Sequence, residues 1–189
     1  MEQKIRAKWL WLTPLFLHFQ IMASELNDTV ERWVIVNDTV MGGRSESNIR
    51  WEDDSESIRF SGELSLENNG GFASIRAIMP ERYFNQAKRI CIKVRGDGRT
   101  YQLRARTNKN LDGIAFVKEF KTSNGEWTSL EFSMDDFTPR FRGRLIRDAG
   151  KLKPENIRQI GFMLADKIPG QFQLDIQGVK PCRSESPLI

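Results

Sequence analysis

Apolar and polar residues alternate along most of the chain after residue 30. In the segment RICIKVR, Ile90, Ile92 and Val94 share one face of an extended backbone, and other residues separate them. Successive side chains of a strand point to opposite faces of a sheet, so this period of two predicts half-buried β-strands. It predicts about nine or ten short strands, which include 33–37, 58–66, 72–79, 89–95, 100–107, 115–120, 127–134, 157–164 and 171–178.

Turn signals separate the predicted strands. Glycine-containing or asparagine-containing turns occur at 42–43, 68–71, 96–98, 111–113 and 124–125. Glycine and asparagine tolerate the positive φ that tight turns need. The segment IKVRGDGRTYQLR is the clearest predicted hairpin, and only 80–88 and 153–158 could form a helical turn. Many short strands with few helices predict an all-β fold, an antiparallel β-sandwich or jelly roll.

The length of 189 residues and the apolar fraction of 39% fit one domain with a packed core. We place this jelly-roll domain at 25–179 and interpret 180–189 as a loose C-terminal tail. The chain shows no internal repeat, no low-complexity segment and no second domain.

The first 24 residues have the pattern of a bacterial signal peptide. Lys4, Arg6 and Lys8 precede a run of about fifteen apolar residues that ends near Ala23. Cleavage there predicts a periplasmic or secreted protein, and the alternative without cleavage is cytoplasmic. An N-terminal helix or a membrane-surface anchor is the other interpretation of 1–24. Any membrane association is expected only through this segment.

The charge balance changes once this segment is set aside. The whole chain has 29 Lys and Arg against 25 Asp and Glu, but residues 25–189 have 26 against 24. Binding to nucleic acid needs a concentrated basic surface. A nearly neutral domain therefore predicts no nucleic-acid partner.

Histidine and cysteine content limits the chemistry. The single histidine, His18, lies in the predicted leader, so a mature domain could form neither a Ser-His-Asp triad nor a His-ligated metal site. Cys91 and Cys182 are too few for a cysteine-only metal centre, but they could pair in an oxidising compartment. The alternation places Cys91 on the polar side of its strand. Asp53-Asp54 and Asp135-Asp136 lack a legible calcium-loop motif, and no metal or cofactor is predicted.

Five segments resemble the NADH:ubiquinone oxidoreductase complex I intermediate-associated protein 30 family. They are WVIVNDTVMGGRSES (33–47), FSGELSLENNGGFASIR (60–76), RGDGRTYQLR (95–104), FKTSNGEWTSLEFSMDDFTPRFRGR (120–144) and IGFMLADKIPGQFQLDI (160–176). The resemblance implies a galactose-binding-like jelly roll and, from the mitochondrial members, an assembly factor or chaperone for respiratory complex I. Where the family commonly has Asp-Gly, this chain has Asp38-Thr39, so the turn must form without that glycine.

Nine residues are candidates for binding a ligand or partner: Asp38, Arg76, Arg95, Arg99, Tyr101, Arg104, Arg106, Trp127 and Asp166. Asp38 and the following Met41-Gly42-Gly43 could form an anion or sugar site, or fix a tight loop. Arg76 could bind a planar ligand group, or pair with Asp97, Asp166 or Asp175.

The other candidates suggest a basic surface with aromatic side chains. We expect Arg95, Arg99, Arg104 and Arg106, with Lys93 and Gln102, to point largely to one side of the predicted hairpin. That side could bind an acidic saccharide or an acidic protein surface, or be a solvated face. Trp127 and Tyr101 could form a sugar platform, whereas Phe137 and Phe141 are more typical of core residues.

These features favour a non-catalytic binding domain that acts by protein–protein contact, with respiratory-complex subunits among the expected clients. The alternative is a periplasmic carbohydrate-binding module that uses the basic sheet face. A hydrolase would need a carboxylate pair. Asp38, Asp97, Asp166 and Asp175 qualify only by residue type, so no enzyme is predicted.

Overall fold

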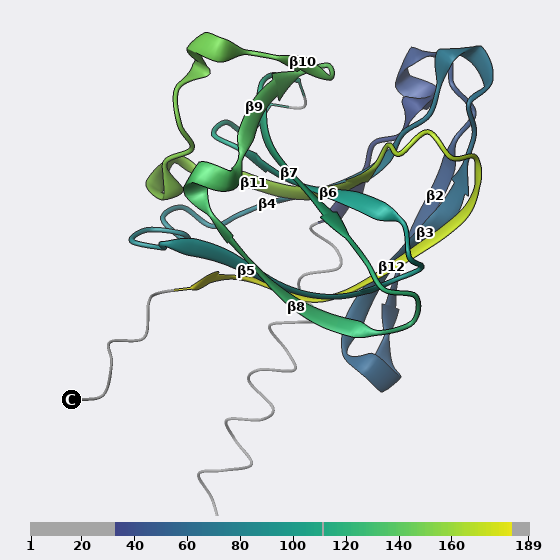
Figure 1. The fold of residues 1–189 in the computed structure, drawn as a ribbon, viewed down its shortest axis with the longest axis horizontal. Helices are drawn as coiled ribbons and strands as arrows, with labels where there is room; N and C mark the ends of the chain where they lie inside the picture. Colours follow the sequence, from purple (N-terminus) through teal and green to yellow (C-terminus); the bar gives the residue numbers. More distant parts are fainter. Residues whose placement is uncertain (1–32, 111, 183–189) are drawn as a thin grey trace, which may run out of the picture.

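The computed structural model describes residues 33–110 and 112–182, which form two facing β-sheets (Figure 1). The first sheet has seven strands in the spatial order β1 (Trp33–Ile35), β4 (Ala73–Ile78), β11 (Gln159–Leu164), β6 (Thr100–Arg106), β7 (Ala115–Lys121), β9 (Thr138–Phe141) and β10 (Arg144–Leu145). The second has five strands in the order β2 (Glu46–Glu52), β3 (Ser57–Leu64), β12 (Gly170–Cys182), β5 (Arg89–Gly96) and β8 (Trp127–Ser133).

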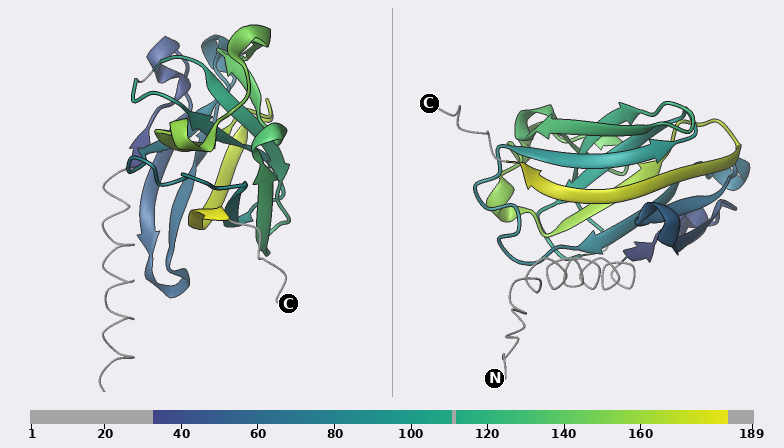
Figure 2. Two further views of the ribbon diagram at one scale, coloured as in Figure 1. Left: turned by 90° about the vertical axis from the view of Figure 1, so that its left-hand side faces the viewer. Right: turned by 90° about the horizontal axis from the view of Figure 1, so that it is seen from below.

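Each pair of neighbouring strands in these sheets is antiparallel. Figure 2 (right) shows the long strand β12 running through the middle of the five-stranded sheet. The prediction of an all-β antiparallel sandwich is therefore confirmed. Each of the nine predicted segments overlaps a strand, whereas β2, β9 and β10 were not predicted.

The predicted hairpin at 92–104 is wrong. Its two strands, β5 and β6, belong to different sheets: β5 pairs with β12 and β8, whereas β6 pairs with β11 and β7. The Gly96-Asp97-Gly98 turn carries the chain from one sheet to the other. Alternation predicts strands, but strand partners here lie far away in sequence.

Two smaller predictions also need correction. Segment 80–88 forms turns and contains no helix, while 154–156 forms a short 3-10 helix. The described helices are all of the 3-10 type: η1 (Asp38–Met41), η2 (Asp53–Ser55), η3 (Glu67–Asn69), η4 (Met134–Asp136), η5 (Arg147–Ala149) and η6 (Pro154–Asn156). Residues 180–182 end strand β12 and are not part of a loose tail. The predicted leader and the remaining tail lie outside the described residues.

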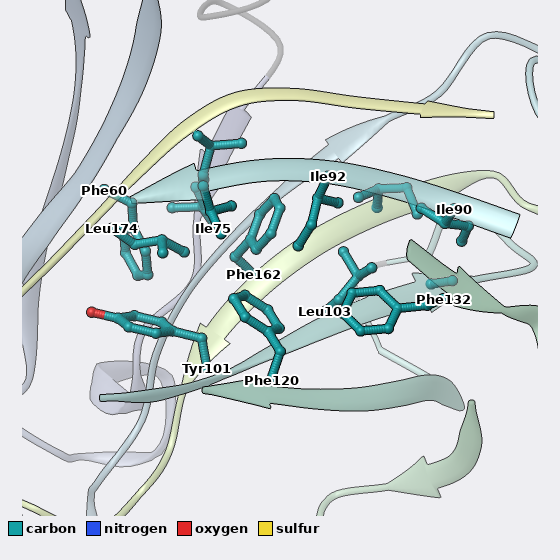
Figure 3. Packing of buried hydrophobic residues seen from close by; sticks show 14 of the residues in the cluster. Phe60, Ile75, Ile90, Ile92, Tyr101, Leu103, Phe120, Phe132, Phe162 and Leu174 are labelled. Atoms are coloured by element: carbon teal, nitrogen blue, oxygen red, sulfur yellow. The ribbon is translucent and has the colours of Figure 1, made fainter. Parts of the chain in front are cut away.

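The core fills the space between the two sheets (Figure 3). Phe60 and Leu174 from one sheet meet Phe162 and Leu103 from the other, and all four side chains are fully buried. Burying a side chain of this size stabilises the fold by about 1.5–3 kcal/mol. Among the described residues, no helix is long and apolar enough to cross a membrane.

Cys91 and Cys182 form a disulfide across β5 and β12, with their Cα atoms 5.8 Å apart. Cys91 lies opposite Lys180, and Cys182 lies opposite Arg89. Both cysteines thus lie on the outer side of the five-stranded sheet, as the alternation predicted for Cys91. The bond joins the end of β12 to the beginning of the neighbouring strand β5.

Candidate functional site

The outer face of the seven-stranded sheet brings four arginines together. Arg76 on β4 and Arg104 on β6 are both cross-strand neighbours of Gly161 on β11. Arg106 follows on β6, and Arg140 on β9 completes the group. Their strand neighbours Ile75, Leu103 and Ala105 point into the core, so the arginines must point away from it. We call these four residues the arginine cluster.

The positive charges of this cluster repel one another. Burial lowers the pKa of Arg104 to about 10, and the guanidinium groups of Arg106, Arg76 and Arg140 add to the effect. Burial and the charge of Arg76 also lower the pKa of Arg106, while Asp112 opposes them. With a pKa of about 10, Arg104 stays protonated near pH 7. The face is therefore a region of concentrated positive charge, for which an anion is the natural ligand.

Arg104, Arg106 and Arg140 form hydrogen bonds with uncharged groups. Arg104 donates to Oε1 of Gln102 at 2.8 Å and lies 3.3 Å from Sδ of Met163. Arg106 donates to the Gly113 carbonyl at 2.6 Å, and Arg140 donates to the Gly143 carbonyl at 3.1 Å. Among residues 33–110 and 112–182, no carboxylate forms a salt bridge with Arg104, Arg106 or Arg140.

A glycine separates two members of the cluster. A Cβ atom at Gly161 would lie 2.6 Å from the Ile75 carbonyl oxygen and 3.2 Å from Cβ of Arg76. Both distances are shorter than ordinary van der Waals contact, so the position excludes a side chain. The sheet surface between Arg76 and Arg104 is consequently free of any intervening side chain. A carboxylate or other oxyanion could contact both guanidinium groups there.

A mainly apolar groove of about 460 Å³ adjoins the cluster. It is lined by Val34, Arg76, Ile78, Met79, Pro80, Glu81, Lys109 and Gln159. Arg76 belongs to both the groove and the cluster. The amide of Gln159 donates to the carbonyls of Asn108 and Asn110, at 2.8 and 2.9 Å, which holds the loop at one end of the groove.

Four sequence candidates occupy other places in the fold. Arg95 and Trp127 are opposite each other on the outer face of the five-stranded sheet. The Arg95 guanidinium carbon lies 4.9 Å from the Trp127 ring centroid, and its Nη2 lies 2.8 Å from Asp175. Arg99 pairs with Asp166 through two contacts of 2.7 and 2.9 Å at one end of the sandwich.

The Asp175 carboxylate is fully buried between two arginines. Arg59 and Arg95 donate to it at distances of 2.7 to 3.1 Å. Burial raises the pKa of Asp175, but these hydrogen bonds outweigh it, and the pKa falls below its ordinary value. Hydrogen bonds and the charge of Arg99 likewise outweigh burial at Asp166 and lower its pKa. Both aspartates are compensated by the protein itself.

Tyr101 is completely buried and cannot act as a surface platform. Its hydroxyl donates to Asp97 at 3.0 Å. Asp97 also accepts a hydrogen bond from the Gln173 amide at 2.9 Å, which ties the loop after β5 to β12. Phe137 lies in the core, and Phe141 is half-buried beneath the guanidinium of Arg142. The predicted aromatic platform of Tyr101 and Trp127 does not form.

Asp38 has a structural environment. Its buried carboxylate accepts hydrogen bonds from the Ser45 amide and hydroxyl at 2.9 and 2.6 Å, and from the amides of Gly71 and Phe72 at 2.6 and 3.2 Å. These hydrogen bonds outweigh burial and lower the pKa of Asp38. Thr39 fits here without positive φ because η1 places the left-handed residue at Gly42 instead. This carboxylate fastens two loops together.

The expectation of one basic hairpin face is therefore wrong for half of its members. Arg104 and Arg106 belong to the arginine cluster, whereas Arg95 and Arg99 are engaged by Asp175 and Asp166. The carboxylates expected as partners of Arg76, namely Asp97, Asp166 and Asp175, all bond elsewhere. Sequence reasoning missed Arg140, because β9 is short and has no clear alternation.

One of the acidic pairs considered for calcium, Asp135-Asp136, has partners within the fold. Asp135 pairs with Lys151 at 2.8 Å, and Asp136 accepts the Ser133 amide at 2.8 Å in a capping box. Within the described part of the chain, no three His, Cys, Asp or Glu side chains are grouped so as to hold a metal. The geometry offers anion binding on one face.

The two facing antiparallel sheets form a jelly-roll fold, which solved carbohydrate-binding modules share. A family 11 module from Clostridium thermocellum, solved in complex with a β-1,3-1,4-mixed-linked tetrasaccharide, superposes with a TM-score of 0.56 at 17% identity and covers 80% of this chain and 91% of the module. The family 11 module of the cellulosomal cellulase Lic26A-Cel5E gives a TM-score of 0.57 at 16% identity, over 80% and 91% of the two chains. At these identities the likeness shows the fold alone.

Residues 20–176 match the family model of Complex I intermediate-associated protein 30 (CIA30), and the chain belongs to that family. The mitochondrial protein of this name from Mus musculus is 26% identical over 170 residues, which cover 79% of this chain and 51% of the mouse protein. A probable counterpart from Caenorhabditis elegans is 27% identical over 117 residues, 60% of this chain and 34% of that protein. The chain thus spans about half or less of these relatives.

Proposed function

We propose that this chain is a non-catalytic binding domain that holds a protein client during assembly of a respiratory complex, and that the arginine cluster forms its contact face. Family membership supports the assembly role. The observation that supports the face is the charge of Arg104, which has no salt bridge among the described residues and whose pKa is lowered by burial and by its cationic neighbours. Contact with an acidic client surface would relieve this repulsion and favour association.

Affinity purification of the tagged full-length chain from its own cells tests the proposal. Mass spectrometry should find respiratory-complex subunits with the wild-type chain and fewer, by tenfold or more, with Arg104→Glu, which is about 1.4 kcal/mol of binding free energy. Arg89→Glu makes the same charge change on the outer face of the other sheet, where Arg89 is 54% exposed, and should leave recovery unchanged. Absence of these subunits from the wild-type sample would contradict the assembly role.

Saccharide binding is the second candidate, and a polar hollow of about 600 Å³ favours it. Glu46, Asn48, Ser61, Glu63, Gln171 and Gln173 line this hollow together with Ser47, Gly62, Asp97 and Phe172. Carboxylates and amides of this kind can hydrogen-bond sugar hydroxyls. The arginine cluster instead suits an acidic sugar.

A glycan array separates these two saccharide sites. If the Glu63→Gln variant no longer binds neutral glycans, the binding site is the hollow. If the Arg104→Glu variant no longer binds acidic glycans, the binding site is the arginine cluster. An array on which the wild-type chain retains no glycan would remove the saccharide candidate.

We also propose that the domain folds in the periplasm or outside the cell. The disulfide between Cys91 and Cys182 supports this location, since such bonds persist in oxidising compartments. N-terminal sequencing should then show that the native protein begins near Ser24 or Glu25. Thiol labelling after denaturation should find no free cysteine. An intact Met1 with two reactive thiols would place the domain in the cytoplasm.

A further inference from the structure

We propose that the arginine cluster and the adjoining groove recognise an extended peptide with an acidic residue at one position and an apolar residue two positions away. This inference rests on the proposed function, because it names the chemistry of the client segment. The acidic side chain would lie over Gly161, between Arg76 and Arg104. The apolar side chain would enter the groove beside Ile78.

The charge of the face supports the acidic position. Arg104 and Arg106 form no salt bridge with any carboxylate of the described residues, and their partners are an amide oxygen, a thioether and a backbone carbonyl. Guanidinium groups bind carboxylates through two parallel hydrogen bonds. A client carboxylate would give Arg104 and Arg106 the charged partner that no described carboxylate supplies through a salt bridge.

The surface at Gly161 gives that carboxylate room. Any side chain at this position would collide with the Ile75 carbonyl, which lies 2.6 Å from the place of a Cβ atom. The bare backbone lets a ligand group approach the sheet between two arginines that come from strands on either side of β11. A side chain at 161 would separate the same two arginines.

The apolar position follows from the groove. Val34 and Ile78 are 51% and 52% exposed, although both are large aliphatic residues. They line the groove with Met79 and Pro80. Covering such side chains with an apolar group removes unfavourable contact with water, at about 25 cal/mol for each Å². The groove therefore favours an aliphatic or aromatic side chain of the client.

The spacing follows from strand geometry. Arg76 and Ile78 are two residues apart on β4 and point to the same side of the sheet. Residues i and i+2 of a strand are separated by roughly 6.6 Å. An extended peptide that lies along β4 has the same repeat, so its residues i and i+2 would meet Arg76 and Ile78 respectively.

Nuclear magnetic resonance titration of the full chain tests the inference, since it detects weak binding. The probe is the peptide acetyl-Gly-Ser-Glu-Ser-Leu-Ser-Gly-amide, with matched peptides that replace Glu by Gln or Leu by Ser. Amide shifts should cluster on β4, β11 and β6. Each replacement should weaken binding by about tenfold, which corresponds to the loss of one charged contact or one buried side chain.

Two protein variants and their controls complete the test. Arg104→Lys keeps the charge but loses the planar guanidinium group, so it should weaken binding of the Glu peptide. Arg89→Lys, on the other sheet, should leave that binding unchanged. Ile78→Ser should weaken binding only of peptides that contain Leu. Val40→Ser makes a similar change at another exposed aliphatic residue and should have no effect. Shifts on the five-stranded sheet, or equal binding of the Glu and Gln peptides, would overturn the inference.

The outcomes distinguish this inference from the proposed function. Recovery of respiratory subunits by the wild-type chain, without any preference for the Glu-Ser-Leu peptide, would leave the assembly role and reject the peptide motif. Selective binding of that peptide without such subunits would support the motif and reject the assembly role.

Discussion

Arg76 and Arg104 face the same residue from opposite sides: both are cross-strand partners of Gly161 in the seven-stranded sheet. One strand, β11, therefore separates the two positive side chains, and the residue of β11 between them, Gly161, has no room for a side chain. Residues with this arrangement contribute little to stability, because burial and neighbouring charge both disfavour the Arg104 guanidinium. We therefore attribute the cluster to binding.

Arg104→Met should stabilise the isolated domain while weakening its binding. Methionine keeps the unbranched stem that packs on the sheet and removes a half-buried charge among three others. We expect the free energy of unfolding to rise by about 1 kcal/mol in urea titrations at low salt. The gain should shrink as salt screens the repulsion. A loss of stability would mean that the charge is compensated in the folded chain.

Gly161→Ala should destabilise the fold. The added methyl group would lie 2.6 Å from a backbone oxygen of the neighbouring strand, which cannot move aside as a flexible side chain would. We expect a loss of roughly 1–3 kcal/mol in the free energy of unfolding. Gly178→Ala is the matched control, because nothing lies within 4 Å of its Cβ position. Equal effects of the two substitutions would contradict the crowding at 161.

Asp175→Asn should be strongly destabilising. The buried carboxylate holds Arg59 and Arg95 together across three strands, and removal of one partner from a buried ion pair costs about 3–5 kcal/mol. Glu131→Gln is the control, because both side chains of its salt bridge to Arg89, at 3.2 Å, are more than half exposed. This substitution should lower the free energy of unfolding by less than about 1 kcal/mol. Thermal unfolding of both variants measures the difference.

Acid should destabilise the domain through three carboxylates. The pKa values of Asp38, Asp166 and Asp175 all lie below the ordinary value of 3.8 in the folded chain. Such groups stabilise the folded state above their unfolded pKa, and this contribution is lost as the pH falls through the folded pKa. Urea midpoints should therefore fall from about pH 5 downward. In Asp175→Asn the decline should be shallower, and an unchanged slope would contradict the lowered pKa of Asp175.

Much of the fold could be predicted because strand alternation is a local signal. The inward residues Ile90, Ile92 and Val94 are buried as their spacing indicates. The pairing of strands is not local, and nothing within 92–104 reveals that β5 and β6 enter different sheets. The turn signal Gly96-Asp97-Gly98 fits a hairpin equally well.

The same limit explains the candidate site. Arg76, Arg104 and Arg106 could be selected by residue type, but their convergence depends on β11, which enters the sheet between β4 and β6 from more than fifty residues away. Arg95 and Arg99 looked equivalent to Arg104 in the sequence, yet each has its own aspartate. Only the three-dimensional arrangement separates Arg104 from the arginines that are paired with an aspartate.

Site-specific photo-cross-linking in living cells tests the central claim, that the arginine face holds a protein client, most directly. A benzophenone amino acid would replace the exposed Glu119, which is beside Gln102 on this face, and in a second strain the exposed Ser129 on the outer face of the five-stranded sheet. We predict a cross-link to a respiratory-complex subunit from position 119, lost in Arg104→Glu, and none from position 129. A cross-link to that subunit from position 129 alone would contradict the account.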